Sequence, residues 1–347
     1  MNTLLSQKSE REPGRTAALC RLIEGNARRL RGAKRGSRFW LDGVYFRVLQ
    51  SDRNTVFRII EGERRWYLKM PRDGSHEAIE RELFGMHAVR WVLEGLDTHT
   101  LPLEFTGSSE QAYVLTSELP GMPLSSALYR CSLLPLPRLR RHVENAFFSL
   151  GAVLARVHRS AIAPGSRTTR SLVTSVTSTV ARARMADWRC AKLIEIAEAL
   201  SPQLATDCLV HGNVGLLNVL TQASKIALID FECCGRGAAY DDVSLVCGHL
   251  IYATAGVHVR NRLLWRVLES FLEGYRAESE LDPAILAQGI ALRLGQHYVY
   301  WFCSGRRRPT IAGLPALRSR VTTLVDEFLV GDPTAALRRL SVGFFRL

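Results

Sequence analysis

The chain has 347 residues, of which 47% are hydrophobic and 23% are charged, and its formal net charge is +13. This length and balance predict one large or two medium-sized domains with a substantial core. No apolar run reaches the roughly eighteen residues of a membrane span, and the N-terminal residues show no secretory signal. The eight cysteines contain no CxxC pair, which argues against a zinc site and predicts a reduced, cytoplasmic protein.

The positive charge comes almost entirely from arginine, because the chain has only five lysines. Basic residues cluster at 28–38, 138–142, 181–185 and 306–308. Such clusters attract phosphates, nucleic acid or an anionic membrane surface, although simple solvated arginines explain the same composition. Aromatic residues are not interleaved with the clusters, so we expect no specific nucleic-acid partner and leave a membrane-surface contact open.

The first part of the chain combines a polar extension with a sheet. Residues 1–38 are polar and basic, and we expect a loose or helical extension there. The range 39–117 is strand-like in FWLDGVYFRVLQ, TVFRII and RRWYLKM, followed by a helix predicted over roughly 76–96 and two more short strands. Strands, one helix and further strands predict an α+β lobe built on an antiparallel sheet.

The second part of the chain is mainly helical. A turn-rich segment predicts a hinge at 118–126, and helices dominate 127–347. One helix has apolar residues at every third or fourth position, namely Val143, Phe147, Leu150, Leu154 and Val157. Two short apolar runs, CLVH and KIALIDFE, lie among the helices, and the turn-like TQASK before the second predicts a small hairpin.

Four pieces with useful chemistry follow one another along these elements. Lys69 ends an alternating strand, and Glu82, with Glu80 as the alternative, lies on the helix that follows. The loop 211–218 reads HGN-x4-N, and Asp230 follows the apolar run IALI across the hairpin. Solvated side chains and turn residues are the ordinary explanation of each piece. Asp230 resists that explanation most, because a buried acid needs a partner or an ion.

The order and spacing of these pieces resemble the aminoglycoside phosphotransferase and choline kinase branch of the protein kinase-like fold, over roughly residues 41–330. The resemblance implies an α+β, two-lobed fold with a small N-lobe, made of an antiparallel sheet and one helix, and a larger, mainly helical C-lobe. It also implies an enzyme that binds ATP and Mg²⁺ and transfers phosphate to a hydroxyl group of a small molecule.

By this resemblance, Lys69 binds the nucleotide phosphates and Glu82 orients Lys69. Asn218 and Asp230 correspond to the metal-binding residues of the family. A lysine ammonium suits phosphate as a point charge, and carboxylate and amide oxygens are the ligands that Mg²⁺ prefers.

The loop that covers the phosphates in this family corresponds to 49–59. Ser51 and Asn54 offer hydrogen-bond donors there, whereas Asp52 would repel phosphate. The segment contains no glycine, which departs from the family pattern and argues against tight, ordinary ATP binding.

A glycine turn and an aspartate follow the metal aspartate in the family and brace the catalytic loop. Gly235 or Gly237 fits the first position, and Asp242 or Asp241 fits the second. A helix N-cap is the simpler explanation of Asp242, and both roles are compatible.

The catalytic loop departs from the usual HGD-x4-N at Asn213, whose amide cannot take a proton from the attacking hydroxyl. His211, the other candidate catalytic residue of this loop, is expected to make structural hydrogen bonds. Four interpretations stay open: a kinase in which Asn213 orients the hydroxyl, a pseudokinase with a regulatory or scaffolding role, an adenylyl transferase, or deliberate replacement of an original aspartate.

The acceptor site of this architecture lies between the catalytic loop and the C-terminal helices, with 241–260 and 297–309 as candidate linings. Aromatic residues beside three arginines in HYVYWFCSGRRRP suit a sugar-like or anionic acceptor rather than a cationic drug. Core aromatics beside a solvated arginine loop would give the same stretch.

Overall fold

The structure is a computed structural model that describes residues 13–340 except for 52, 95–98, 101–103, 135, 161–167, 170, 184–186, 256–260 and 301–314. The chain forms two compact units, one from Met1–His87 with Pro102–Pro120 and the other from Ala88–Leu101 with Gly121–Leu347. Within the part that is described, we find no helix long and apolar enough to span a membrane.

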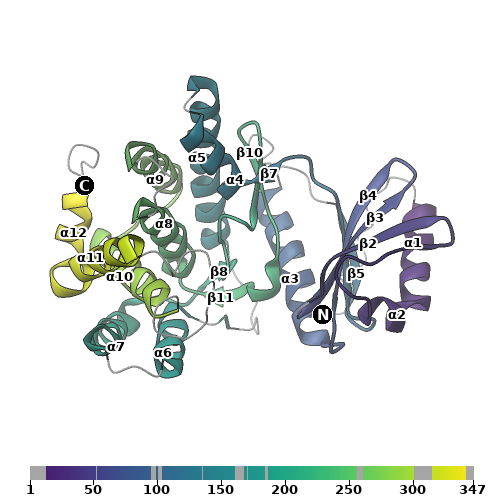
Figure 1. The fold of residues 1–347 in the computed structure, drawn as a ribbon, viewed down its shortest axis with the longest axis horizontal. Coiled ribbons are helices and arrows are strands. Elements are labelled where there is room, and N and C mark those ends of the chain that lie inside the picture. The colour runs from purple at the N-terminus through teal and green to yellow at the C-terminus, as the bar shows by residue number, and fades with distance from the viewer. Residues whose placement is uncertain are drawn as a thin grey trace. The chain divides into compact units, whose positions relative to one another are not determined.

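The first unit is built on a six-stranded antiparallel sheet in the order β1-β2-β3-β4-β6-β5 (Figure 1). Its strands are β1 (Arg38–Leu41), β2 (Val44–Ser51), β3 (Asn54–Glu61), β4 (Arg64–Pro71), β5 (Phe105–Ser108) and β6 (Tyr113–Ser117). The strand-like stretch 39–50 is divided between β1 and β2. Asp42 and Gly43 both have positive φ angles and form the tight hairpin turn between these strands.

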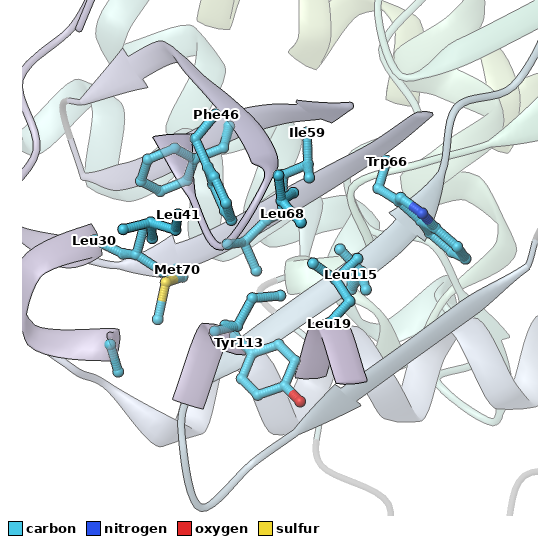
Figure 2. Close-up of a cluster of buried hydrophobic side chains, with 14 of the residues drawn as sticks. Leu19, Leu30, Leu41, Phe46, Ile59, Trp66, Leu68, Met70, Tyr113 and Leu115 are labelled. Atoms are coloured by element: carbon cyan, nitrogen blue, oxygen red, sulfur yellow. The ribbon is translucent and has the colours of Figure 1, made fainter. Parts of the chain in front are cut away.

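Three helices accompany this sheet: α1 (Pro13–Gly25), α2 (Ala27–Arg31) and α3 (His76–Leu93), of which residues up to His87 belong to the first unit. Leu19 of α1 and Leu30 of α2 are buried in the same cluster as Phe46 of β2 (Figure 2). The ring of Phe46 lies 5.6 Å from that of Phe39 and 6.0 Å from that of Phe57. The segment at 13–31 is therefore helical and contributes to the core of the first unit.

The second unit is mainly helical. Its helices are α4 (Leu124–Leu133), α5 (Pro137–Arg159), α6 (Leu172–Arg182), α7 (Trp188–Leu200), η1 (Ser201–Gln203), η2 (Phe231–Cys233), α8 (Ala239–Ala255), α9 (Asn261–Arg276), α10 (Pro283–Tyr298), α11 (Pro315–Val330) and α12 (Pro333–Leu340). Its short strands are β7 (Met122–Pro123), β8 (Cys208–Val210), β9 (Val219–Gln222), β10 (Lys225–Leu228) and β11 (Gly235–Gly237). β9 and β10 form the predicted antiparallel hairpin, and β8 pairs with β11.

Helix α5 packs against α9, and its predicted apolar face is buried. All five residues that the sequence placed on this face are fully buried, namely Val143, Phe147, Leu150, Leu154 and Val157. Gly151 of α5 and Gly274 of α9 permit a close approach, because a Cβ atom at either position would clash with the backbone of the other helix. The two helices therefore form a tightly packed pair.

One buried carboxylate on α8 fixes β8 and the loop that follows it. Asp242 Oδ2 accepts the backbone N–H of His211 at 2.7 Å, and Oδ1 accepts that of Gly212 at 2.9 Å. Oδ2 also lies 3.2 Å from Nε2 of His158, whose Nδ1 lies 2.9 Å from the hydroxyl of Tyr275. Burial alone would raise the pKa of Asp242, but the hydrogen bond and charge of His158 hold it below its usual range. This carboxylate therefore connects the loop to α5 and α9.

Phe46→Ala is expected to lower the free energy of unfolding of the first unit by about 3–5 kcal/mol, because it leaves a cavity in the sheet core. Chemical denaturation followed by tryptophan fluorescence measures the change. Trp40→Ala is the matched control, since Trp40 is an aromatic residue of the same sheet that is 66% exposed. Equal losses in the two variants would show that the buried cluster does not stabilise this unit.

Asp242→Asn is expected to lower the free energy of unfolding by about 3–5 kcal/mol, as for the loss of one member of a buried pair. The folded-state pKa of Asp242 lies below its usual value of 3.8. The stabilisation by the Asp242 carboxylate is therefore complete at pH values above 3.8. It is lost as the pH falls below 3.8 through the lower folded-state pKa. Denaturation midpoints measured from pH 6 to pH 3 should show that the variant lacks this part of the acid dependence.

The matched control for this measurement is Asp332→Asn, which changes an exposed aspartate at the start of α12 whose carboxylate accepts backbone N–H groups. Asparagine also serves at helix N-caps, so this control should change stability by less than about 1 kcal/mol. If Asp242→Asn kept the acid dependence of the parent chain, the proposed charge on Asp242 would be wrong.

Candidate active site

A lysine–glutamate pair occupies the first unit. Lys69 lies on β4, between Val56 of β3 and Val114 of β6, and its side chain is 16% exposed. Its Nζ lies 2.7 Å from Oε2 of Glu82 on α3, whose side chain is 7% exposed. Glu80 is exposed, so the structure selects Glu82 from the two acids that the sequence left open. An ion pair so protected from water holds the ammonium group in one place.

The segment proposed to cover phosphates is the tip of the β2–β3 hairpin. Ser51 is the last residue of β2 and is in register with Thr55 of β3, and Asn54 opens β3 opposite Pro71. Asp52, the acid that departs from the family pattern, lies outside the described residues. The structure thus places Ser51 and Asn54 at the two ends of a short strand connection.

The ring of His211 binds two backbone groups of the second unit, one in its own loop and one after β10. Its Nδ1 accepts the backbone N–H of Asn213 at 3.3 Å, so its Nε2 carries the proton and donates it to the carbonyl of Ile229 at 3.1 Å. Burial lowers the pKa of His211, which keeps the ring neutral. Both ring nitrogens are engaged, so this histidine organises the loop and has no free nitrogen for a substrate proton.

Asn213 and Asn218 are joined within the same loop. Nδ2 of Asn218 donates to the backbone carbonyl of Asn213 at 2.9 Å, which leaves the amide oxygen of Asn218 for a cation. The preceding Gly212 has a φ of +75°, and a Cβ atom at this position would clash with the carbonyl of Cys233. Glycine is therefore required where the loop packs against η2.

Asp230 lies at the same end of the β9–β10 hairpin as Asn218. Val219 and Leu228 are in register at this end, and the next bond in the ladder runs from the N–H of Ile229 to the carbonyl of Asn218 at 3.0 Å. Asp230 adopts a left-handed conformation, with φ 68° and ψ 63°. Such a backbone is costly for a residue with a side chain, and its cost is most often tolerated at functional sites.

The donor set at this hairpin end fits a magnesium ion that also binds phosphate. Asn218 and Asp230 supply one amide and one carboxylate oxygen, which are hard ligands. No group of three or more His, Cys, Asp and Glu side chains suited to a metal occurs among the described residues. A Mg²⁺ ion held by these two side chains would complete its coordination with phosphate oxygens and water, as is usual for this ion at nucleotide sites.

The glycines and aspartates that follow Asp230 bind different parts of the second unit. Gly235 and Gly237 lie in β11, opposite Val210 and Cys208 of β8, so they form a strand instead of a turn. Asp242 holds the loop, whereas the Asp241 carboxylate accepts the first backbone N–H of α6, from Leu172, at 2.7 Å. Burial raises the pKa of Asp241. Of the two aspartates, Asp242 is therefore the one that contacts the loop 211–218.

Two histidines and a tyrosine lie beside the loop on α8 and α10. The ring of His297 lies 4.9 Å from that of His249 and 5.1 Å from that of Tyr252. A Cβ atom on Gly215 of the loop would lie 3.5 Å from Cε1 of His249. Burial lowers the pKa of His249 to about 4 and that of His297 to about 3, so both rings are neutral at pH 7.

A buried arginine accompanies these rings. Nη2 of Arg293 on α10 donates to the backbone carbonyl of Asp241 at 2.7 Å, and Nη1 donates to Gln296 at 3.1 Å. The proposed linings 241–260 and 297–309 are described only up to 255 and 300, so the three arginines at 306–308 lie outside the described residues. The described wall beside the loop is thus aromatic, with a cationic group close to it.

Sequence reasoning did not assign functions to His158, Tyr275, His249 or His297. The partners of His158 lie 84 and 117 positions away in the chain, so no local spacing relates them. A signal did exist for His158, which follows the last residue of the predicted apolar face of α5 and therefore lies next to the core. Such a histidine needs buried hydrogen-bond partners.

Comparison with known proteins supports the predicted family. A family model described as the phosphotransferase enzyme family (APH) matches residues 46–281. A search of curated protein sequences gives no significant match.

Solved structures with the same fold cover nearly the whole chain. Amicoumacin kinase hAmiN, in complex with AMP-PNP, Ca²⁺ and Ami, has a TM-score of 0.56 and 14% identity, with 92% of this chain and 95% of that chain covered. A choline/ethanolamine kinase family protein from Mesorhizobium loti has a TM-score of 0.54 and 13% identity, covering 85% and 92%. Spectinomycin phosphotransferase APH(9)-Ia, in complex with ADP and spectinomycin, has a TM-score of 0.52 and 14% identity, covering 92% and 98%.

These similarities establish a two-lobed, kinase-like α+β fold, and the family match extends over more than half of the sequence. The chain belongs to the phosphotransferase enzyme family that includes aminoglycoside phosphotransferases, as its motifs predict.

Proposed function

We propose that this protein binds Mg-ATP and transfers the terminal phosphate to a hydroxyl group of a small neutral or anionic molecule. The observation that carries the proposal is the backbone ladder, in which Asn218 and Asp230 lie at the same end of a hairpin. The hAmiN structure, which contains a nucleotide analogue and a divalent cation, supports the proposal by analogy of fold.

In this proposal the nucleotide and metal are held by separate groups. Lys69 binds the phosphates while Glu82 keeps its ammonium in place, and Ser51 and Asn54 add hydrogen bonds to phosphate. Asn218 and Asp230 hold Mg²⁺, which supplies neutralisation of the phosphate charge when bound. Residues 39–117 then serve as the nucleotide-covering lobe, 118–126 as the hinge and 127–347 as the lobe that binds the acceptor.

Asn213 takes the position of the general base without its chemistry. Its side-chain amide can orient the acceptor hydroxyl but cannot remove the proton. His211 does not compensate, because both of its ring nitrogens bind backbone groups. Phosphoryl transfer depends mainly on positioning and on charge neutralisation, so a slow enzyme is consistent with this site.

The acceptor class follows from the groups beside the loop. His249, Tyr252 and His297 are neutral rings beside the loop, and the buried Arg293 lies close to the two histidines. None of these three described side chains is a carboxylate, the group that would favour a polycation such as an aminoglycoside. Rings suit the flat face of a sugar or nucleoside. The three arginines at 306–308 of the sequence suit an anionic acceptor.

A pseudokinase is the second candidate function. Two observations favour it: the asparagine at position 213 and the absence of glycine in the proposed phosphate-covering segment at 49–59. In that case the chain would bind nucleotide without transferring phosphate, or would bind neither nucleotide nor metal, and would act on a partner protein.

The free thiols of all seven described cysteines support the proposal of a cytoplasmic location for either function.

Mg-ATP is expected to raise the melting temperature, because a ligand at about 100 times its Kd stabilises the folded chain by about 2.7 kcal/mol. Asp230→Ala should abolish the part of the rise that depends on Mg²⁺, since it removes the one carboxylate of the proposed metal site. Thermal denaturation with Mg-ATP, with ATP and EDTA, and without ligand measures both effects. The control is Asp207→Ala, at an exposed acid just before β8.

Absence of any shift at millimolar Mg-ATP would favour a scaffold that does not bind nucleotide. A full shift in Asp230→Ala would show that this residue does not hold the metal.

Asn213→Asp is expected to raise the rate of phosphate transfer by about 10²–10⁴-fold, because it restores a proton acceptor beside the hydroxyl. Coupled detection of ADP release measures the rate with a nucleoside, a hexose and a hexose phosphate, and with kanamycin and choline as cationic acceptors. Asn145→Asp, at an exposed asparagine on α5, is the matched control.

Transfer to kanamycin or choline in preference to the other acceptors would contradict the proposed acceptor class. A parent chain that already turns over rapidly, with no gain in Asn213→Asp, would show that position 213 does not need a base. Mg-ATP binding without turnover in both chains would establish the pseudokinase, and transfer of label from α-³²P-ATP would indicate adenylyl transfer.

A further inference from the structure

Several large apolar side chains are exposed where α4 is followed by α5. Tyr129 is 47% exposed, Leu133 54%, Leu134 59% and Leu136 59%. We call these four residues the leucine corner. The opposite face of α4 is buried through Leu124, Ala127, Leu128 and Cys131, so the exposed residues form a second apolar face. Exposed apolar residues gathered in this way mark interaction surfaces more often than scattered ones do.

Backbone hydrogen bonds hold the leucine corner in a defined shape. The N–H of Leu134 donates to the carbonyl of Arg130 at 2.9 Å, and that of Leu136 donates to the carbonyl of Leu134 at 2.7 Å. The N–H of Arg140 then donates to the carbonyl of Leu136 at 2.9 Å and begins the ladder of α5. The leucines are therefore presented by the ends of two helices.

Exposed arginines flank the leucine corner, with no acid between Glu118 and Glu144 to balance them. Arg130 precedes the corner, and Arg138 and Arg141 follow it, all three exposed. Glu144 is engaged by Arg140 at 2.8 Å and lies 3.9 Å from Arg266 of α9. The segment from 119 to 143 therefore carries basic residues and no acidic ones.

Helix stability does not explain these arginines. Arg138 and Arg141 lie in and just after the first turn of α5, which contains no acidic residue. The N-terminal end of a helix carries a partial positive charge, so cations there are unfavourable. An external anion would offset both the arginines and the helix end.

We propose that the leucine corner and its three exposed arginines dock on an anionic lipid bilayer. The leucines and Tyr129 enter the boundary between headgroups and acyl chains, while Arg130, Arg138 and Arg141 bind lipid phosphates and carboxylates. Apolar insertion or charge alone gives weak and reversible binding, whereas the two together give a stable peripheral contact. This inference goes beyond the proposed function and does not depend on it.

The charge distribution favours a bilayer over a second copy of the chain as the occupant. A symmetric dimer through the leucine corner would bring two sets of the three arginines together without acids between them, and each chain carries a net charge of +13. Like charges so arranged oppose association. An anionic surface instead attracts both the corner and the molecule as a whole.

Sedimentation of the full chain with large unilamellar vesicles tests the proposal. We expect binding to vesicles of 70% phosphatidylcholine and 30% phosphatidylserine, no binding to pure phosphatidylcholine, and weaker binding as the salt concentration rises. Combined Leu133→Ser, Leu134→Ser and Leu136→Ser should weaken binding more than tenfold. Combined Arg130→Gln, Arg138→Gln and Arg141→Gln should weaken it about 100-fold, or about fivefold for each arginine.

Matched controls lie on other exposed faces of the same unit. Val330→Ser changes an aliphatic residue that is 71% exposed on α11, and Arg182→Gln changes an exposed arginine at the end of α6. Neither should alter vesicle binding more than about twofold. Melting temperatures of all variants report whether each chain is folded, and a single Leu134→Ser variant replaces the triple variant if that one is unstable.

Three results would overturn the proposal. One is the absence of binding to the anionic vesicles, and another is full binding by the leucine variants, which would leave only non-specific attraction by the charge of the chain. The third is self-association of the parent chain in analytical ultracentrifugation that the leucine variants abolish, which would assign the corner to a second copy. Loss of Mg-ATP binding, in contrast, would leave this inference untouched.

Discussion

The buried carboxylate of Asp242 is the constraint on which the candidate active site depends. An anion without contact to water must be matched by donors, and this one receives the backbone N–H groups of His211 and Gly212 together with His158. These bonds hold the loop at the end of β8, where Gly212 takes up a left-handed conformation against η2. Asn213 and Asn218 therefore belong to a loop whose backbone is held by this carboxylate.

The proposed chemistry uses two electrostatic elements of opposite sign. In the first unit, Lys69 carries a positive charge that Glu82 holds in place, which suits phosphate. In the second unit, Asn218 and Asp230 present oxygen atoms at the end of a hairpin, which suits a divalent cation. In this proposal Asn213 takes the position of the catalytic aspartate but lacks its proton-accepting group. Positioning and charge neutralisation thus carry the proposed reaction, and proton removal is its weak step.

The excess of arginine has several physical explanations within one chain. Arg293 is buried and binds a backbone carbonyl, and Arg189 is paired with Asp326 at 2.6 Å while its guanidinium lies over the rings of Trp188 and Tyr298. Such arginines are structural. Those beside the leucine corner are exposed, lack acidic neighbours in the sequence and oppose the dipole of α5. Composition alone cannot separate these two kinds, because each contributes equally to the net charge.

The sequence by itself determined the family, the two-part architecture and the loop that carries the candidate chemistry, because local order and spacing encode them. The apolar face of α5, the β9–β10 hairpin and HGN-x4-N are each recognised within a short stretch of sequence. Tertiary structure decided the choice of Glu82 over Glu80 and of Asp242 over Asp241. It also brought His158 and Tyr275 to the loop brace and assembled His249, Tyr252 and His297. The partners of these residues lie on other helices, so sequence spacing does not reveal their contacts. Burial sets the protonation of His249 and His297 beside the loop.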